Sequence, residues 1–281
     1  MYVKDKIRLK IVKRIREIMF IKNLFNSLDF WLRRKIKFSR GTYFIKNEPK
    51  TELFDHLNNK DRQAAELKER EYFQRYNLYE LKDNSTRRNY LENLYTIELL
   101  EQNLNPSPSN KDISILDIGS KNWFYAEGEY NFFKYANFDK TIQLTGIEID
   151  AYRLYTNLYS RYDYAKAYIK NLENTSYIAD DLMNHQGQYD YITWFLPFVT
   201  PNPLLNWGLP LKHFKPEDML CKAYNLLKPG GKMLIVNQGE KEHLIQKKLL
   251  ESLNINYDSK GEFESIFLYY NYKRFITVVN K

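Results

Sequence analysis

Two acidic residues, each at the end of an apolar run, are the first candidates for chemistry in this sequence. Asp117 and Gly119 close the run that starts at Ile113, and Glu148 closes a second run one crossover length later. A strand, a glycine turn, a helix and a second strand ending in an acid are how an α/β sheet builds a nucleoside site. A carboxylate at the second strand tip can accept hydrogen bonds from both ribose hydroxyls. The pair therefore predicts a site for a nucleoside cofactor.

The chain from Ile113 onward alternates short apolar runs with longer amphipathic stretches. This alternation predicts strands at 113–118, 142–147, 176–179, 190–195 and 232–237. It predicts helices at about 124–137, 151–171, 216–227 and 240–253, and Asp150 is expected to cap the second of these. Two last strands are expected at Ser265–Tyr270 and Arg274–Val279. The pattern is typical of an α/β, Rossmann-like fold with a mostly parallel seven-stranded sheet and an antiparallel edge strand.

Helices are expected before this sheet. Apolar residues recur at steps of three or four from Ile7 to Ile36, with a break expected near Asn23–Asn26. This spacing predicts one amphipathic helical stripe. Further helices are expected over 60–76 and from Ser85 or Thr86, either of which can cap a helix.

A short segment rich in proline and serine, Asn105–Asn110, separates the helices from the strands. Such a segment predicts a boundary loop. We therefore expect an N-terminal helical extension at 1–105 and a cofactor-binding domain at 106–281.

The first forty residues carry most of the positive charge. They hold thirteen Lys or Arg and three acids, a formal charge of +10, whereas the whole chain carries +8. Three interpretations of this arm, residues 1–40, remain open. Its apolar stripe packs on the rest of the chain or on another subunit, or the arm lies on an anionic membrane surface, or it binds nucleic-acid phosphates. The long apolar stripe and the few aromatic residues favour a membrane over nucleic acid.

The composition predicts a packed protein without disulfides or metal. Hydrophobic residues make up 43% and aromatic residues 16% of the chain, which exceeds what disordered chains carry. Cys221 is the single cysteine, and no run approaches the roughly 18 apolar residues of a membrane span. The four histidines and this cysteine have no ligand spacing, so no metal is expected. We expect a cytoplasmic location, with peripheral membrane association through the arm left open; the sequence predicts no oligomeric state.

Five motifs follow one another in the second half of the chain. They are Leu116–Ser120, Gly146–Glu148, Tyr177–Asp181, Tyr189–Phe198 and Leu227–Gly231. In this order they resemble the motifs of the class I, Rossmann-like S-adenosylmethionine-dependent methyltransferases, and the likeness covers roughly residues 86–281. The resemblance implies an enzyme that uses S-adenosyl-L-methionine as its cofactor and methylates an acceptor that the sequence does not identify.

The resemblance also implies roles for residues at the first two strand tips. Gly119 and Ser120 would turn the chain beside the methionine part of the cofactor. Asp117 would accept from the cofactor ammonium group or brace the loop through backbone amides. Glu148 would accept from the ribose hydroxyls.

The third and fourth motifs complete the expected cofactor site. Asp181, or Asp180 if the motif shifts by one residue, would accept from the adenine amino group. Trp194 would form an apolar wall near the reactive methyl group or belong to the core of the sheet.

The acceptor side is expected to be apolar. Phe195, Pro197 and Phe198 stand where amine-methylating relatives carry Asn/Asp-Pro-Pro-Tyr, so the carbonyl that would hold a substrate amine is missing. This argues against nucleobase-amine or glutamine-amide methylation and favours a small or lipid-like acceptor. The proline-rich segment 199–216 is expected to be a lid loop that adds Trp207 to the acceptor pocket. His213, on this loop, is the candidate general base or a surface residue.

Two alternatives to an active methyltransferase remain open. Lys121 and Trp123 stand where the family usually has glycines, which allows a catalytically degenerate methyltransferase-fold binding module, associated with a membrane or with nucleic acid. The other alternative is a nicotinamide-dependent oxidoreductase. The Lys228–Gly231 turn and the terminal pair of strands speak against it.

Overall fold

The computed structural model describes residues 2–55, 57–104, 106, 112–136 and 141–281, with side chains placed at residue 14 and from residue 16 on. The boundary loop expected at Asn105–Asn110 lies, apart from Pro106, outside the described residues. Among the described helices, none has the length and apolar character required to cross a membrane.

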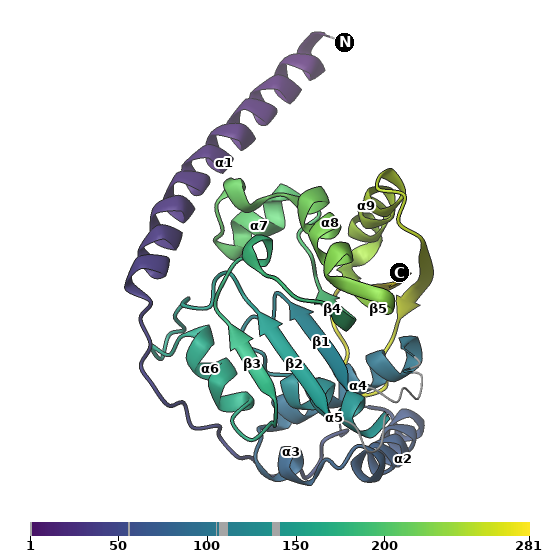
Figure 1. Cartoon of the computed structure of the whole chain (residues 1–281). Coiled ribbons are helices and arrows are strands. Elements are labelled where there is room, and N and C mark those ends of the chain that lie inside the picture. Colours follow the sequence, from purple (N-terminus) through teal and green to yellow (C-terminus); the bar gives the residue numbers. More distant parts are fainter. Residues whose placement is uncertain (1, 56, 105, 107–111, 137–140) are drawn as a thin grey trace.

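A seven-stranded sheet in the order β3-β2-β1-β4-β5-β7-β6 forms the centre of the molecule (Figure 1). Neighbouring strands are parallel except that β7 runs antiparallel to both β5 and β6. This confirms the predicted Rossmann-like sheet with an antiparallel edge. The strands are β1 (Ile113–Ile118), β2 (Ile142–Ile147), β3 (Thr175–Ile178), β4 (Tyr189–Phe195), β5 (Leu227–Gln238), β6 (Tyr257–Phe263) and β7 (Arg274–Asn280).

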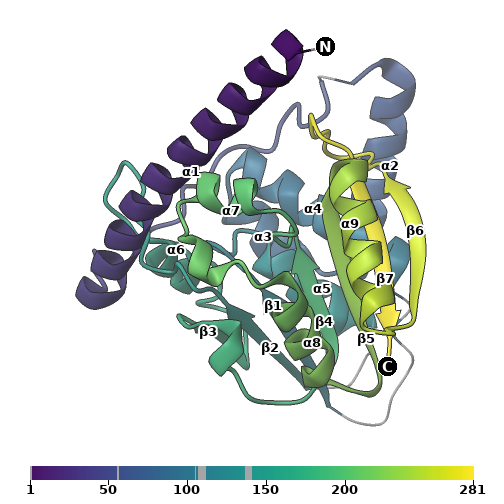
Figure 2. The same cartoon turned by 90° about the horizontal axis from the view of Figure 1, so that it is seen from above.

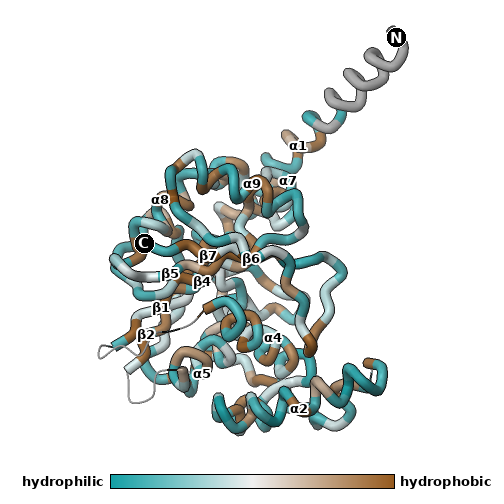
Figure 3. The backbone as a smooth tube through the Cα atoms, turned by 90° about the vertical axis from the view of Figure 1, so that its right-hand side faces the viewer, coloured by the Kyte–Doolittle hydropathy of each residue, from teal (hydrophilic) through white to brown (hydrophobic). Residues whose placement is uncertain are grey.

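Helices cover both faces of the sheet (Figure 3). One face packs on α4 (Arg87–Asn103) and α5 (Ala126–Ala136), and the other on α8 (Pro216–Leu226) and α9 (Gly239–Ser252). Successive side chains of a strand point to opposite faces, so β1 sends Ile115 to the first core and Leu116 to the second. Asp117 follows Leu116 and therefore faces α5.

The sheet register brings the two expected binding elements together. β1 and β2 pair Asp117 with Gly146 and Ile118 with Ile147. The turn after β1 and the acid after β2 therefore meet at one edge of the sheet, as the sequence predicted.

The helix expected at 151–171 is shorter than predicted. α6 is Arg161–Tyr168, and a capping box between Ser160 and Asp163 fixes its start. The preceding residues form turns and a short bridge between Leu154 and Ser160. The prediction that Asp150 caps this helix is wrong, because a residue ten positions upstream of the cap cannot reach the free amides of its first turn.

The strand expected at Ser265–Tyr270 is also misplaced, since β6 ends at Phe263. Ser265 Oγ and the Ile266 amide both donate to the carboxylate of Glu98 on α4, at 2.6 and 3.1 Å. These two hydrogen bonds fix the loop to α4, and Phe267 is fully buried against Phe54 and against Tyr72 of α2.

The N-terminal third is helical. It contains α1 (Tyr2–Ile36), α2 (Asn59–Arg75), α3 (Tyr79–Asp83) and α4, whose N-cap is Thr86. α1 is continuous through Asn23–Asn26, where a break was expected. The two asparagine side chains bond the segment around Leu205–Leu211 rather than the local backbone, so they do not interrupt the helix.

The segment expected to be a lid loop contains regular structure. α7 (Pro201–Trp207) begins with a proline in its first turn and ends at Gly208, whose φ is +89°. A 3-10 turn, η2 (Leu211–His213), follows. α7 lies between the body and α1, which runs along the edge of the molecule (Figure 2).

Candidate cofactor and acceptor cavity

A cavity of about 1040 Å³ opens at the carboxyl ends of β1, β2, β3 and β4. This is where ligands bind in open α/β sheets, near the point where the strand order reverses. Most of the residues singled out in the sequence line it: Gly119, Glu148, Asp180, Asp181, Trp194, Phe195, Pro197, Phe198, Trp207 and His213. Asp117 and Ser120 are buried nearby and are not among its lining residues.

The turn after β1 follows a path that glycine usually takes. Gly119 has φ +74°, and Lys121 and Trp123, which stand at positions where glycines were expected, have φ +56° and +49°. The amides of Gly119 and Ser120 both donate to the carbonyl of Ile147, at 2.9 and 3.2 Å. The loop thus keeps left-handed conformations without glycine, at a cost of about 1–2 kcal/mol for each such residue.

The Trp123 side chain occupies the space beside Gly146 of β2, which has no side chain of its own. Trp123 is fully buried, and a Cβ on Gly146 would lie 2.8 Å from its ring and 2.7 Å from Ser120 Oγ. The ring therefore packs directly on the β2 backbone. This packing compensates part of the strain in the turn.

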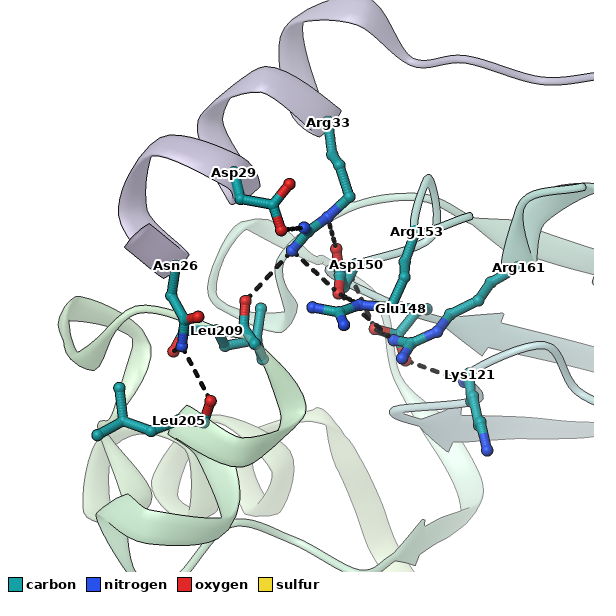
Figure 4. A network of polar contacts seen from close by, with 11 residues as sticks. Asn26, Asp29, Arg33, Lys121, Glu148, Asp150, Arg153, Arg161, Leu205 and Leu209 are labelled. Atoms are coloured by element: carbon teal, nitrogen blue, oxygen red, sulfur yellow. Dashed lines mark hydrogen bonds and ion pairs between the residues drawn. The ribbon is translucent and has the colours of Figure 1, made fainter. Parts of the chain in front are cut away.

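Glu148, at the tip of β2, is held in place by backbone amides. Its two carboxylate oxygens accept from the amides of Lys121 at 2.9 Å and Asp150 at 2.8 Å. Arg161 Nη1 lies 3.6 Å from the same carboxylate (Figure 4). Burial raises the pKa of Glu148, and the positive charge of Arg161 and the two amide donors oppose that rise. The carboxylate is thereby fixed at the cavity wall.

Asp150, two residues after Glu148, is the centre of an ion-pair network (Figure 4). Its carboxylate lies 2.8 Å from Arg33 Nε of α1, 2.6 Å from Arg153 Nε and 3.6 Å from Arg161 Nη1. The network connects the N-terminal helix to the acid at the tip of β2 through one residue. Sequence reasoning missed it, because no local pattern shows that Arg33 reaches a residue so distant in the chain.

Asp117 belongs to a buried acidic pair on the α5 side of the sheet. The Asp117 carboxyl group interacts with Glu129 of α5, Tyr125 and Trp123, and Glu129 also accepts from Thr193 Oγ1 at 2.6 Å and Trp123 Nε1 at 3.3 Å. Burial, and then the nearby Glu129, raise the pKa of Asp117 well above its usual value. Burial also raises the pKa of Glu129 to about 7. Ser120 Oγ donates to the Asp117 carbonyl at 3.0 Å, a hydrogen bond that stabilises the turn after β1.

His213 and Asp181, which the sequence treated separately, contact each other at the cavity wall. His213 Nδ1 lies 3.3 Å from Asp181 Oδ2, and none of the described groups bonds its buried Nε2. Burial would raise the pKa of Asp181, but the contact with His213 and the Met183 amide lower it below its usual value. Phe30 of α1 packs edge-on against the His213 ring, with centroids 4.9 Å apart. The imidazole is thus oriented by a carboxylate, as in a general base.

Asp180 sits beside this pair. Its Oδ1 accepts from the Asp181 amide at 2.7 Å and from Asn184 Nδ2 at 3.1 Å. Arg34 of α1 lies 3.4 Å from the same oxygen. Both acids of the third motif therefore face the cavity, and α1 contacts one of them.

Aromatic and aliphatic residues line the cavity beyond β4. Phe195, Leu196, Pro197 and Phe198 all contribute, and Leu196 has φ +57°. A leucine in this conformation is strained, and such strain tends to occur at binding and catalytic sites. Trp194 both lines the cavity and packs in the core on the α8 side, so both sequence interpretations of it are compatible with its position.

Part of the wall was not expected from the sequence. Four of these wall residues are Tyr95 and Glu92 of α4, together with Tyr270 and Arg274. The Arg274 guanidinium stacks 4.4 Å from the Tyr270 ring centroid, and Tyr270 donates to Glu92. The signal that could have found this group was the unusual density of tyrosine and charge at 269–274.

Two cations face the indole of Trp207 on α7. Lys121 Nζ lies 5.2 Å and the Arg161 guanidinium 4.5 Å from its ring centroid. Burial, together with Arg161, lowers the pKa of Lys121. Cation–π contacts of this kind attach α7 to the turn after β1 and to α6.

No protein-family model and no curated protein sequence matches the chain. Several solved structures are similar to part of its backbone at low sequence identity. A SAM-dependent methyltransferase from Aquifex aeolicus has a TM-score of 0.44 and 14% identity over 65% of this chain and 87% of its own. TrmN from Thermus thermophilus has 0.46 and 15%, over 69% of this chain and 52% of its own. Magnesium protoporphyrin IX methyltransferase from Synechocystis PCC 6803, with bound SAH, has 0.42 and 11%, over 69% and 85%.

Proposed function

We propose that this protein binds S-adenosylmethionine and transfers its methyl group to an apolar or aromatic acceptor. One observation carries the proposal: the Gly119 turn and the Glu148 carboxylate, on adjacent strand tips, open into the same cavity. Its volume of about 1040 Å³ lies at the upper end of what small-molecule sites occupy. A nucleoside cofactor and a second small molecule fit such a space.

The proposed cofactor roles follow from position and charge. Glu148 accepts from the ribose hydroxyls, and charged hydrogen bonds of this type contribute about 1.5–3 kcal/mol each. The Gly119 turn lies beside the methionine part, and Asp180 or Asp181 accepts from the adenine amino group. Asp117 is left out of direct contact, because its side chain faces α5 with Glu129. Its proposed role is to hold the loop.

The proposed methyl transfer requires few catalytic side chains. The cofactor supplies an electrophilic methyl group, so the protein must hold the acceptor in line and exclude water. Orientation alone can lower a barrier by about 7–11 kcal/mol. If Asp180 rather than Asp181 takes the adenine amino group, Asp181 is left to orient His213, whose Nε2 is unbonded among the described groups, as the proposed base where the acceptor must lose a proton. The aromatic wall at Phe195 and Phe198 favours a small, apolar acceptor.

Titration calorimetry tests the proposal. Binding of S-adenosylmethionine, and of its demethylated product, is expected. If neither binds and no nucleotide replaces them, the protein is a binding module on a methyltransferase-like fold. If NAD(H) binds instead, the acid at Glu148 serves the ribose of an oxidoreductase cofactor.

A further inference from the structure

The described part of α1 contacts the body mainly through polar residues. Asn26 Nδ2 donates to the carbonyl of Leu205 at 2.9 Å, and Arg33 pairs with Asp150. Phe30 is the single described residue of α1 that is buried, at 2% exposure. These residues lie three, four or seven positions apart and so share one side of the helix. This side is the docked face of α1.

The opposite side of α1 is apolar and faces solvent. Phe25 is 67% and Leu24 62% exposed, which is unusual for side chains of this size. We call this the outer face, and it consists of Ile21, Leu24, Phe25, Leu28, Trp31 and Leu32. The helix therefore buries its polar side on the protein and leaves its apolar side free. This rules out one sequence interpretation for the described residues, in which the apolar stripe packs on the body.

Basic residues lie at both ends of the outer face. Arg14, Arg16, Lys35 and Lys37 are exposed. They belong to a forty-residue segment with thirteen Lys or Arg and three acids. An apolar face bordered by positive charge matches a surface whose charged layer is negative and whose interior is apolar.

The position of α1 leaves this face accessible. The helix runs past α7 at the edge of the molecule (Figure 2), and its N-terminal end projects beyond the body (Figure 1). Since the docked face points to α7, the outer face points away from the body. The side chains of the outer face are therefore open to solvent from Ile21 to Leu32.

We propose that the outer face of α1 binds the surface of an anionic phospholipid bilayer. The apolar side chains enter the boundary between headgroups and acyl chains, and the Lys and Arg residues lie among the lipid phosphates. A second copy of the chain would cover the apolar side chains but would bring two strongly positive segments together. A nucleic acid would neutralise the charge but leave the apolar face in water. This proposal does not rest on the proposed cofactor.

Co-sedimentation of the full chain with vesicles tests the proposal. Binding is expected to vesicles of phosphatidylcholine with phosphatidylglycerol, and to weaken in pure phosphatidylcholine and at high salt. The variant Leu24→Gln/Phe25→Gln/Leu28→Gln is expected to lose at least about tenfold in partition coefficient, because glutamine keeps the helix but not the apolar face. The variant Arg14→Gln/Arg16→Gln/Lys35→Gln is expected to lose affinity for the anionic vesicles only.

The matched control is Leu67→Gln, which removes an exposed leucine from α2. It is expected to bind vesicles as the unchanged chain does, and all variants should unfold at the same temperature. Equal vesicle binding by the triple leucine and phenylalanine variant overturns the proposal. It is also overturned if the full chain forms a dimer in light scattering that this variant dissociates, and neither protein sediments with vesicles.

Discussion

The Trp123 ring packs against the Cα of Gly146 with no room for a side chain between them: a Cβ there would lie 2.8 Å from the ring. Because Trp123 is fully buried, it cannot swing away. We expect Gly146→Ala to lower the free energy of unfolding by about 1–3 kcal/mol, the usual cost of overpacking. Urea denaturation measures it.

A double-mutant cycle supplies the control for this prediction. Trp123→Leu creates space at the same point, so adding Gly146→Ala to it should cost clearly less than in the native background. Strictly additive losses would show that the two residues do not share this space.

Glu148 is the residue whose change should most affect the cofactor. Glu148→Gln keeps the shape of the side chain but removes the charge and one acceptor oxygen. We expect affinity for S-adenosylmethionine to fall by about tenfold or more, equal to about 1.4 kcal/mol or more. Titration calorimetry measures the change, and Glu173→Gln, an exposed acid distant from the cavity, is the control. Unchanged affinity at unchanged stability would refute the ribose assignment.

Much of the sheet follows from its sequence because periodicity is local. The predicted bounds of β1 and β2 agree with the structure, since a buried strand between polar turns leaves few alternatives. The predicted secondary structure was wrong where a contact with a residue distant in the sequence determines the local conformation. Residues 265–270 have a strand-like composition, but Glu98 of α4 binds Ser265 and holds the segment as a loop.

The candidate site divides in the same way. The motif of Glu148 placed this residue at a strand tip. The alternation of side chains along β1 could have shown that Asp117 points to the same face of the sheet as Ile115, the face that α5 covers. The contacts of His213 with Asp181 and of Arg33 with Asp150 could not be predicted. They depend on how α7 and α1 pack over the sheet, which no spacing in the sequence encodes.

The buried pair of Asp117 and Glu129 should make stability depend on pH. Burial raises the pKa of Glu129 from 4.5 to about 7, so the folded protein binds this proton more tightly than the unfolded chain. The resulting stabilisation is present below about pH 4.5 and is lost as the pH rises through 7. The slope contributed by one such group is at most about 1.4 kcal/mol per pH unit.

Urea denaturation between these pH values measures this slope. Glu129→Gln removes the titrating group and keeps an acceptor for Thr193, so its stability should fall less steeply with pH than that of the native chain. Parallel curves for the two proteins would show that folding does not shift the pKa of Glu129.

Arg33 should affect both the docking of α1 and the cofactor site. Its guanidinium binds Asp150, whose amide holds Glu148. We expect Arg33→Gln to speed proteolysis within α1 and to weaken S-adenosylmethionine binding roughly threefold, a fraction of one charged hydrogen bond. Lys35→Gln, in an exposed position on the same turn, should change neither. Faster proteolysis with native affinity would show that the network does not transmit the loss to Glu148.

The backbone at Lys121 offers a test of whether the turn after β1 follows the path of a glycine loop. Its φ of +56° disfavours any branched side chain, while glycine adopts it freely. Lys121→Val should therefore lower the free energy of unfolding by about 1–2 kcal/mol, whereas Lys121→Gly should stay within about 1 kcal/mol of the native value, since relief of strain offsets the lost contact with Trp207. The order should reverse at Lys248, an exposed residue within α9, where glycine costs about 1 kcal/mol and valine less. If glycine is the worse substitution at Lys121 as well, the loop does not hold the left-handed conformation, and the cofactor cannot approach its backbone in the way proposed.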